Sequence, residues 1–382
     1  MVKYITKETR NQVWNIKLLI NLLFSDEENR LKQEVIRSDI DWDMLLTIAQ
    51  RERVLSPVLT RIMSVLSSEP YNNTKSLVQK KLDECRERSR TALGLISGIQ
   101  DVLTKDKIGF VVFKTLDDYP NIPSEDIDIM IVKEDIRKAE DAFLNLETKP
   151  YLYEKGPLAY TGETPEKRHF HFKLGVFHFE VELYPELTLL GEEYIPAVDI
   201  IRNLSPKNFD GKTVFLPSQE DDLLILVIHA VFKHGGLIRL SDIYTAKRLL
   251  ENEHLDWSHI FSRSYESWII VGLIYFLDII NSFFSEQYGR PLLPNHVLHF
   301  TKSLSKKGIP RIREIPYRIP WFALFYIYKT IADASRLRWC SALKTFQACI
   351  FKTFGRTLFC IYKLTHTYSS LKRWGWYLSI KL

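Results

Sequence analysis

The sequence predicts an α+β protein, in which a small mixed sheet is flanked by helices and helical regions lie at both ends. Residues 11–100 show helical apolar spacing, residues 108–183 contain β-branched and aromatic runs, and helical patterns return after Pro217. Because 382 residues exceed the usual size of one core, several units are expected. We divide the chain into an N-terminal helical region (1–103), an α/β core (104–214), a helical domain (215–300) and a basic, aromatic C-terminal helical region (301–382).

The composition is typical of a globular protein, with 46% hydrophobic and 26% charged residues. The four cysteines form no C-x-x-C pair, which indicates reduced thiols in a cytoplasmic protein. The first residues contain no uninterrupted apolar stretch, so no signal peptide is expected. The sequence lacks the Walker loop, the G-x-G-x-x-G fingerprint, the G-x-S-x-G elbow and the H-E-x-x-H motif, which disfavours the enzyme classes that depend on them.

The first hundred residues are expected to form a helical scaffold. An apolar helix ends before Ser25, a second begins after Asp41 as its N-cap, and a third begins near Pro57. Residues 76–102 then form one long helix with alternating charged and apolar positions.

The α/β core begins with a strand at residues 108–114, followed by a loop at 115–123 that contains two prolines. The next strand, 124–132, carries Asp126 and Asp128. Side chains two residues apart on a strand share one face, so these carboxylates lie side by side. Two such carboxylates repel each other unless a cation lies between them, which favours a Mg²⁺ site. The alternative is that Ser124 and Asp126 only end a turn before a buried strand.

After a helix that starts at Lys133 and a loop at 151–165, residues 169–173 and 177–183 alternate around Gly175 and predict a hairpin. Its second arm has phenylalanine, valine and leucine on one face and ionisable residues on the other: His178, Glu180 and Glu182. This face is either part of the acidic site or simply solvated. A transition-metal site at His169, His171 and His178 is the weaker alternative, because no ligand spacing supports it.

The helical domain follows. Ser218 is the expected N-cap of a helix that runs to His234, and further helices are expected from Leu240 to Leu250 and over residues 268–284.

A strand, a short loop, a D-x-D strand and a later acid-bearing strand together resemble the polymerase-β-type nucleotidyltransferase superfamily. Within it, the chain is most similar to an uncharacterised nucleotidyltransferase-like family of archaea and bacteria. The resemblance covers roughly residues 40–250 and is carried by residues 41–49, 113–116 with 124–131, 179–184 and 217–243.

The resemblance implies a role for particular residues. Asp126 and Asp128 would be catalytic, metal-binding carboxylates, with Glu180 as the third and Glu182 as its alternative. They would hold two Mg²⁺ ions, or Mn²⁺ instead. The residues expected to bind substrate phosphate are Lys114, Thr115, Ser124, Arg168 and Lys173.

The resemblance implies transfer of a nucleoside monophosphate from a nucleoside triphosphate to an unknown hydroxyl acceptor. In the superfamily a Gly-Gly or Gly-Ser turn lets backbone N–H groups approach the triphosphate, whereas this chain has Lys114-Thr115. The alternative is therefore a catalytically weak or inactive relative that binds nucleotide, nucleic acid or an anionic membrane surface.

The net charge of +5 is unevenly distributed. Residues 301–382 contain 16 Lys and Arg residues against only Glu314 and Asp333. Interleaved aromatic and basic residues suit nucleic acid or an anionic membrane surface, to which the protein would be peripheral. The favoured interpretation is a helical subdomain whose aromatics form a core and whose charges are solvated.

Overall fold

The structure is a computed structural model. It describes residues 7–36, 40–67, 73–114, 116, 119–120, 126–155, 167–185, 187–189, 192–233, 238–251, 254–267 and 269–306. The C-terminal region expected at 301–382 therefore lies outside the described residues from 307 onward. The four-part division of the chain stays a prediction.

The N-terminal third is helical, as predicted. Its helices are α1 (Lys7–Phe24), α2 (Glu28–Ile36), α3 (Trp42–Arg51), α4 (Leu55–Val65) and α5 (Asn73–Lys105). The expected N-cap at Asp41 is confirmed, because its Oδ1 accepts a hydrogen bond from the Met44 N–H at 3.0 Å. The short helix α2 was not predicted.

The central sheet has five strands in the order β1-β2-β5-β4-β3. Only the β2–β5 pair is parallel, so the sheet is mixed and the predicted fold class is confirmed. The strands are β1 (Phe110–Phe113), β2 (Asp126–Ile131), β3 (Leu152–Lys155), β4 (Arg168–Leu174) and β5 (Phe177–Tyr184).

The β4–β5 hairpin is confirmed, with Gly175 in the left-handed region at φ +59°. The loop expected at 151–165 is wrong in part, because Leu152–Lys155 pairs with β4 as the edge strand. Four residues are too few to show alternation, and the strand is defined by its partner rather than by its own sequence.

Two small hairpins were not predicted. They are formed by β6 (Leu187–Leu189) with β7 (Glu192–Ile195), and by β8 (Ser205–Phe209) with β9 (Lys212–Leu216). The second turns at Asp210-Gly211, where both φ angles are positive, at 48° and 80°. An Asp-Gly pair is a strong hairpin signal, so this turn was open to prediction.

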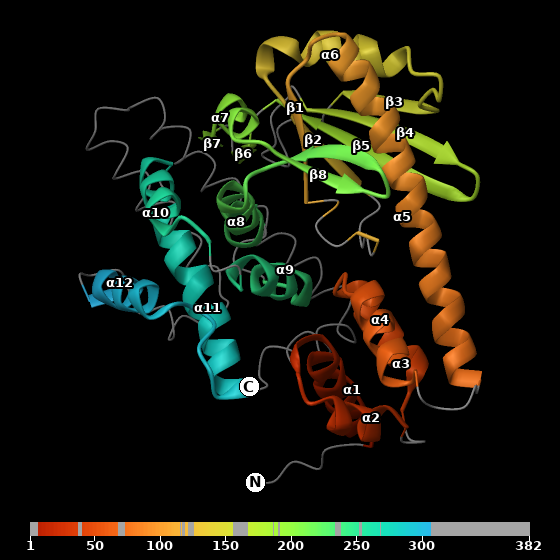
Figure 1. Cartoon of the computed structure of the whole chain (residues 1–382), viewed down its shortest axis with the longest axis vertical. Coiled ribbons are helices and arrows are strands. Elements are labelled where there is room, and N and C mark those ends of the chain that lie inside the picture. The colour runs from red at the N-terminus through yellow and green to blue at the C-terminus, as the bar shows by residue number, and fades with distance from the viewer. Residues whose placement is uncertain are drawn as a thin grey trace, which may run out of the picture.

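The two faces of the sheet contribute to different hydrophobic cores. From β2, Ile127, Ile129 and Ile131 join one core with the C-terminal half of α5 and with α6 (Ile136–Leu144). Met130, on the opposite face, joins the other core with the N-terminal helices and the downstream helices. Figure 1 shows α5 running from the sheet down to the level of the N-terminal helices, with α4 and α9 (Leu240–Leu250) below the sheet. Asp126 and Asp128 share the face of Met130, so the acids lie at the border between the sheet and the helical regions.

The remaining elements are mostly helical. They are η1 (Lys133–Asp135), α7 (Ala197–Arg202), α8 (Gln219–Val227), the π-helical η2 (Ile228–Lys233), α9 (Leu240–Leu250), α10 (Trp257–Glu266), α11 (Ile270–Tyr288) and α12 (Asn295–Lys306). The predicted cap of α8 is confirmed, since the Ser218 hydroxyl accepts from the Asp221 N–H at 3.1 Å. None of the helices in the described part of the chain combines the length and apolarity that a bilayer crossing requires.

Candidate active site on the acidic face of the sheet

Four carboxylates form two neighbouring pairs on one face of the sheet. In the parallel β2–β5 register Asp126 lies beside Glu180, and Asp128 lies beside Glu182. The acids therefore converge across one strand spacing, as the two-residue period of each strand predicts. What the local pattern did not contain is the pairing itself, which joins segments about fifty residues apart in the chain.

Burial and crowding of negative charge shape the protonation of this face. Burial raises the pKa of Asp126, and the charges of Asp128, Glu182 and Glu180 raise it further, while Arg53 opposes them. For Glu182, burial raises the pKa, but the Lys167 ammonium and hydrogen bonds from Lys167, Tyr184 and Asp128 outweigh it, so the pKa is lowered. A bound cation would lower the pKa of Asp126, because its charge would offset the repulsion from the neighbouring acids.

Three basic side chains border the acids. The Nζ atom of Lys114 lies 3.5 Å from Oδ2 of Asp128, and Nη2 of Arg53 lies 4.0 Å from Oδ2 of Asp126. Lys167, whose side chain is only 2% exposed, places its Nζ 2.9 Å from Oε2 of Glu182. Lys167 also lies over the Tyr184 ring, and the Tyr184 hydroxyl donates to the same Glu182 oxygen.

His169 of β4 extends the acidic face by one more strand. Its Nδ1 lies 2.6 Å from Oε1 of Glu180 and 3.4 Å from Oε1 of Glu182. Their ligand atoms all lie within 4.8 Å of one another, which makes these three residues a group able to hold a metal ion. Two carboxylates compete here for one ring nitrogen, which has at most one proton to donate.

A comparison with protein families identifies the family to which the chain belongs. A family model described as an uncharacterised nucleotidyltransferase matches residues 38–285, more than half of the chain. The chain belongs to this family. No curated protein matches it. The family suggests a transferase that uses a nucleoside triphosphate, and the match includes the acidic face, the N-terminal helices from α3 onward and the helices through most of α11.

The turn after β1 has a left-handed backbone in this member of the family without having a glycine. Lys114 has φ +59°, in the left-handed region that an L-residue adopts at a cost. Lys114 therefore adopts a conformation that glycine adopts readily, and it adds a side chain and a charge. The neighbouring Thr115 and Ser124, both expected to bind phosphate, lie outside the described residues.

The other two expected phosphate-binding residues lie differently. Arg168 precedes Phe170 and Phe172 on the face of β4 that enters the core shared with α5 and α6, and its Nε pairs with Glu140 of α6 at 3.0 Å. Lys173 is on the acidic face but opposite His178, two residues beyond the Glu180 position. Their predicted role stays a proposal, and the geometry supports Lys114 better than either.

Sequence reasoning missed Lys167, Tyr184 and Arg53. Lys167 has the same period as His169 on the face of β4, so alternation extended by two residues would have found it. Tyr184 continues the face of Glu180 and Glu182 by the same rule. Arg53 lies in helices interpreted as scaffold, and no local pattern connects it to β2.

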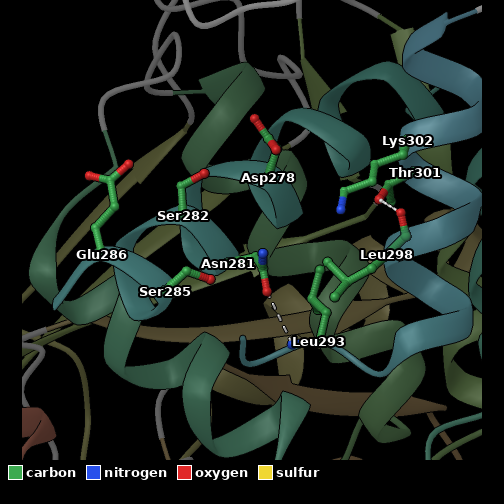
Figure 2. Close-up of a pocket in the computed structure, with 9 residues that line it drawn as sticks. All are labelled: Asp278, Asn281, Ser282, Ser285, Glu286, Leu293, Leu298, Thr301 and Lys302. Carbon is green, nitrogen blue, oxygen red and sulfur yellow. Dashed lines mark hydrogen bonds between the residues drawn. The ribbon is translucent and has the colours of Figure 1, made fainter. Parts of the chain in front are cut away.

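A separate pocket of about 250 Å³ lies between α11 and α12. Figure 2 shows its lining residues, none of which belongs to the acidic face. The Asn281 side chain accepts from the backbone N–H groups of Leu292 and Leu293 at 3.2 and 3.4 Å, and the Thr301 hydroxyl donates to the Leu298 carbonyl at 3.1 Å. The Asn281 bonds tie α11 to the segment that leads to α12, whereas the Thr301 bond lies within α12.

Proposed function

We propose that this protein is a Mg²⁺-dependent nucleotidyltransferase that transfers a nucleoside monophosphate from a nucleoside triphosphate to a hydroxyl acceptor. The observation that carries the proposal is the placement of Asp126 and Asp128 beside Glu180 and Glu182 across the parallel β2–β5 pair. Carboxylate oxygens are the ligands that Mg²⁺ and Mn²⁺ prefer.

The donor set fits such an ion. Asp126 and Asp128 would hold it, with Glu180, which lies beside Asp126, as the third carboxylate and Glu182, which lies beside Asp128, as the alternative. When bound, a divalent ion supplies charge neutralisation to phosphate oxygens. Lys167 and Tyr184 keep Glu182 ionised and fix its orientation, because both contact the same Oε2 atom.

In the proposed reaction, the acceptor oxygen forms a bond to the α-phosphorus as the bond from that phosphorus to the bridging oxygen breaks. Diphosphate leaves with the electron pair, and the hydroxyl proton passes to a carboxylate. Asp126 suits this last task, because its side chain is 37% exposed, the most accessible of the four acids.

Transfer of label from an α-labelled triphosphate to a panel of hydroxyl acceptors tests the proposal. We expect metal-dependent labelling that is lost when Asp126→Asn and Asp128→Asn are combined. Asp141→Asn, an exposed acid on α6, is the matched control and should keep full labelling. Labelling that persists in the double variant would refute the proposal.

A second candidate is a relative that binds nucleotide without turnover. It is favoured by the basic side chains of Lys114, Arg53 and Lys167, each beside one of the acids that would ligate metal. Calorimetry with Mg²⁺ and triphosphates separates the two candidates, since binding without any labelled product supports the second and rapid product formation excludes it.

For residues 301–382 the favoured interpretation stays a helical subdomain with solvated charges. The alternative that we propose on charge alone is an anionic partner, which would be either nucleic acid or a membrane surface to which a cytoplasmic protein would be peripheral. Flotation with anionic vesicles and an RNA shift assay, both across a salt series, distinguish the two partners. If deleting residues 307–382 changes neither, the solvated helical subdomain is supported instead.

A further inference from the structure

The turn between α3 and α4 carries a basic residue that faces the acidic site from outside the sheet. In this turn the Arg53 N–H donates to the Gln50 carbonyl at 3.0 Å, and the Val54 N–H donates to the Ala49 carbonyl at 2.8 Å. Val54 is fully buried in the core that contains the N-terminal helices. The backbone of Arg53 is therefore fixed from both sides, and it has φ +59°.

The guanidinium of Arg53 is near Asp126 without being hydrogen-bonded to it. The 4.0 Å separation of Nη2 and Oδ2 is too long for a hydrogen bond, and the Arg53 side chain is 42% exposed. Its field also reaches Asp242 in α9, whose pKa it lowers in part. Arg53 thus lies where the N-terminal helices, the sheet and the downstream helices meet.

Arg53 and Lys114 form a matched pair around the two aspartates. Each lies beside one aspartate, at 4.0 and 3.5 Å, and each has φ +59°. Only four non-glycine residues in the described part of the chain have a positive φ, and two of them bring a positive charge to this one acid pair. Left-handed backbone in L-residues persists where the surroundings enforce it, and it concentrates at functional sites.

A phosphate chain is the ligand that suits this arrangement. A divalent ion held by Asp126 and Asp128 would neutralise the charges of these carboxylates. The positive charges of Arg53 and Lys114 beside them would then favour an additional anion. A guanidinium presents parallel N–H groups that match two phosphate oxygens, and an ammonium offers a compact charge. These two groups would supply the donors that a glycine turn offers through its backbone N–H groups elsewhere in the superfamily.

We propose that Arg53 and Lys114 together bind the diphosphate portion of the nucleoside triphosphate, so that the N-terminal helices supply one wall of the nucleotide site. This inference rests on the proposed function for its choice of ligand. The competing explanation is that Arg53 only neutralises Asp126 and Asp242.

Calorimetry of the full chain with Mg²⁺ and inorganic diphosphate tests the inference. The same titration with a non-hydrolysable nucleoside triphosphate and with the nucleoside monophosphate gives the ratio of their affinities. Because the lost hydrogen bonds are charge-assisted, we expect Arg53→Gln to weaken diphosphate and triphosphate binding by about tenfold to a hundredfold. Monophosphate affinity should stay unchanged, so the ratio falls, and Arg53→Lys should give an intermediate loss.

Arg51→Gln is the matched control, because it removes the same charge from the end of α3, where Arg51 lies 3.6 Å from Glu52. An unchanged triphosphate-to-monophosphate ratio in Arg53→Gln, with the parent protein binding triphosphate, would overturn the inference alone. Failure of the parent to bind triphosphate would overturn the proposed function, and failure to bind diphosphate as well would overturn the inference with it. A parent that binds diphosphate in an Arg53-dependent way supports the anion site whatever the acceptor proves to be.

Discussion

The left-handed backbone at Lys114 can be tested by comparing a glycine and an alanine substitution. Both remove the charge, and only alanine keeps the backbone strain. Lys114→Gly and Lys114→Ala both remove the ammonium beside Asp128 and its contacts with the Phe113 and Tyr184 rings. They differ only in the Cβ atom at φ +59°. An L-residue there costs about 1–2 kcal/mol, and the extra chain entropy of glycine offsets about 0.5–1 kcal/mol of that. We therefore expect the glycine variant to be more stable than the alanine variant by about 1 kcal/mol.

Urea unfolding of the two variants, followed by circular dichroism, measures this difference directly. The same exchange at Lys80, an exposed position within α5, is the control, because alanine should be the more stable residue in a helix by about 1 kcal/mol. A glycine variant at position 114 that is no more stable than the alanine variant would refute the left-handed turn. Diphosphate binding in Lys114→Ala, measured in parallel, should be weaker than in the parent protein.

Three further predictions concern the site and its supports. Glu182→Gln leaves the Lys167 ammonium buried without its carboxylate, so the free energy of unfolding should fall by about 3–5 kcal/mol. Adding Lys167→Met should recover much of this loss, and no recovery would contradict the ion pair. Burial raises the pKa of Asp242 from 3.8 to about 6, so its ionisation opposes folding. The stability that this group contributes is fully present below about pH 4 and lost as pH rises through 6. The parent should therefore lose about 2.5 kcal/mol relative to Asp242→Asn between pH 4 and 7.5 in urea unfolding, and parallel pH profiles would refute this. In α5, a Cβ at Gly94 or Gly98 meets no atom within 4 Å. Each change to alanine should therefore raise the thermal midpoint, with a gain of about 0.5–1 kcal/mol in the free energy of unfolding. A lowered midpoint would mean that the helix is interrupted there.

The parts of the site that the sequence predicted are those that depend on local period. Alternation along residues 126–131 and 177–184 placed the acids on one face, and Figure 1 shows these strands, β2 and β5, side by side in the sheet. The fold class followed from the same periods and from the caps at Asp41 and Ser218. Parallel pairing, in contrast, joins strands through a long crossover, and no local pattern specifies its register.

The side chains around the acids were harder to predict for the same reason. Lys167 is buried because the hairpin brings the start of β4 beside Glu182 and Tyr184 of β5, whereas an isolated lysine before a strand is usually exposed. Arg53 reaches Asp126 from helices more than seventy residues earlier in the chain. Such contacts are properties of the assembled fold, and the edge strand β3 escaped prediction on the same ground.

The long helix α5 sets the dimensions of this protein. Its 33 residues make a rod of about 50 Å. Val78 and Leu82 near one end are buried in the core of the N-terminal helices, whereas Ile96 and Leu103 near the other are buried under the sheet. The N-terminal helices that carry Arg53 and the sheet that carries Asp126 thus both pack against the same helix. A movement of the N-terminal helices relative to the sheet would require α5 to bend or one of the two cores to be disrupted. The continuous helix therefore limits how far Arg53 and Asp126 can separate when a ligand binds.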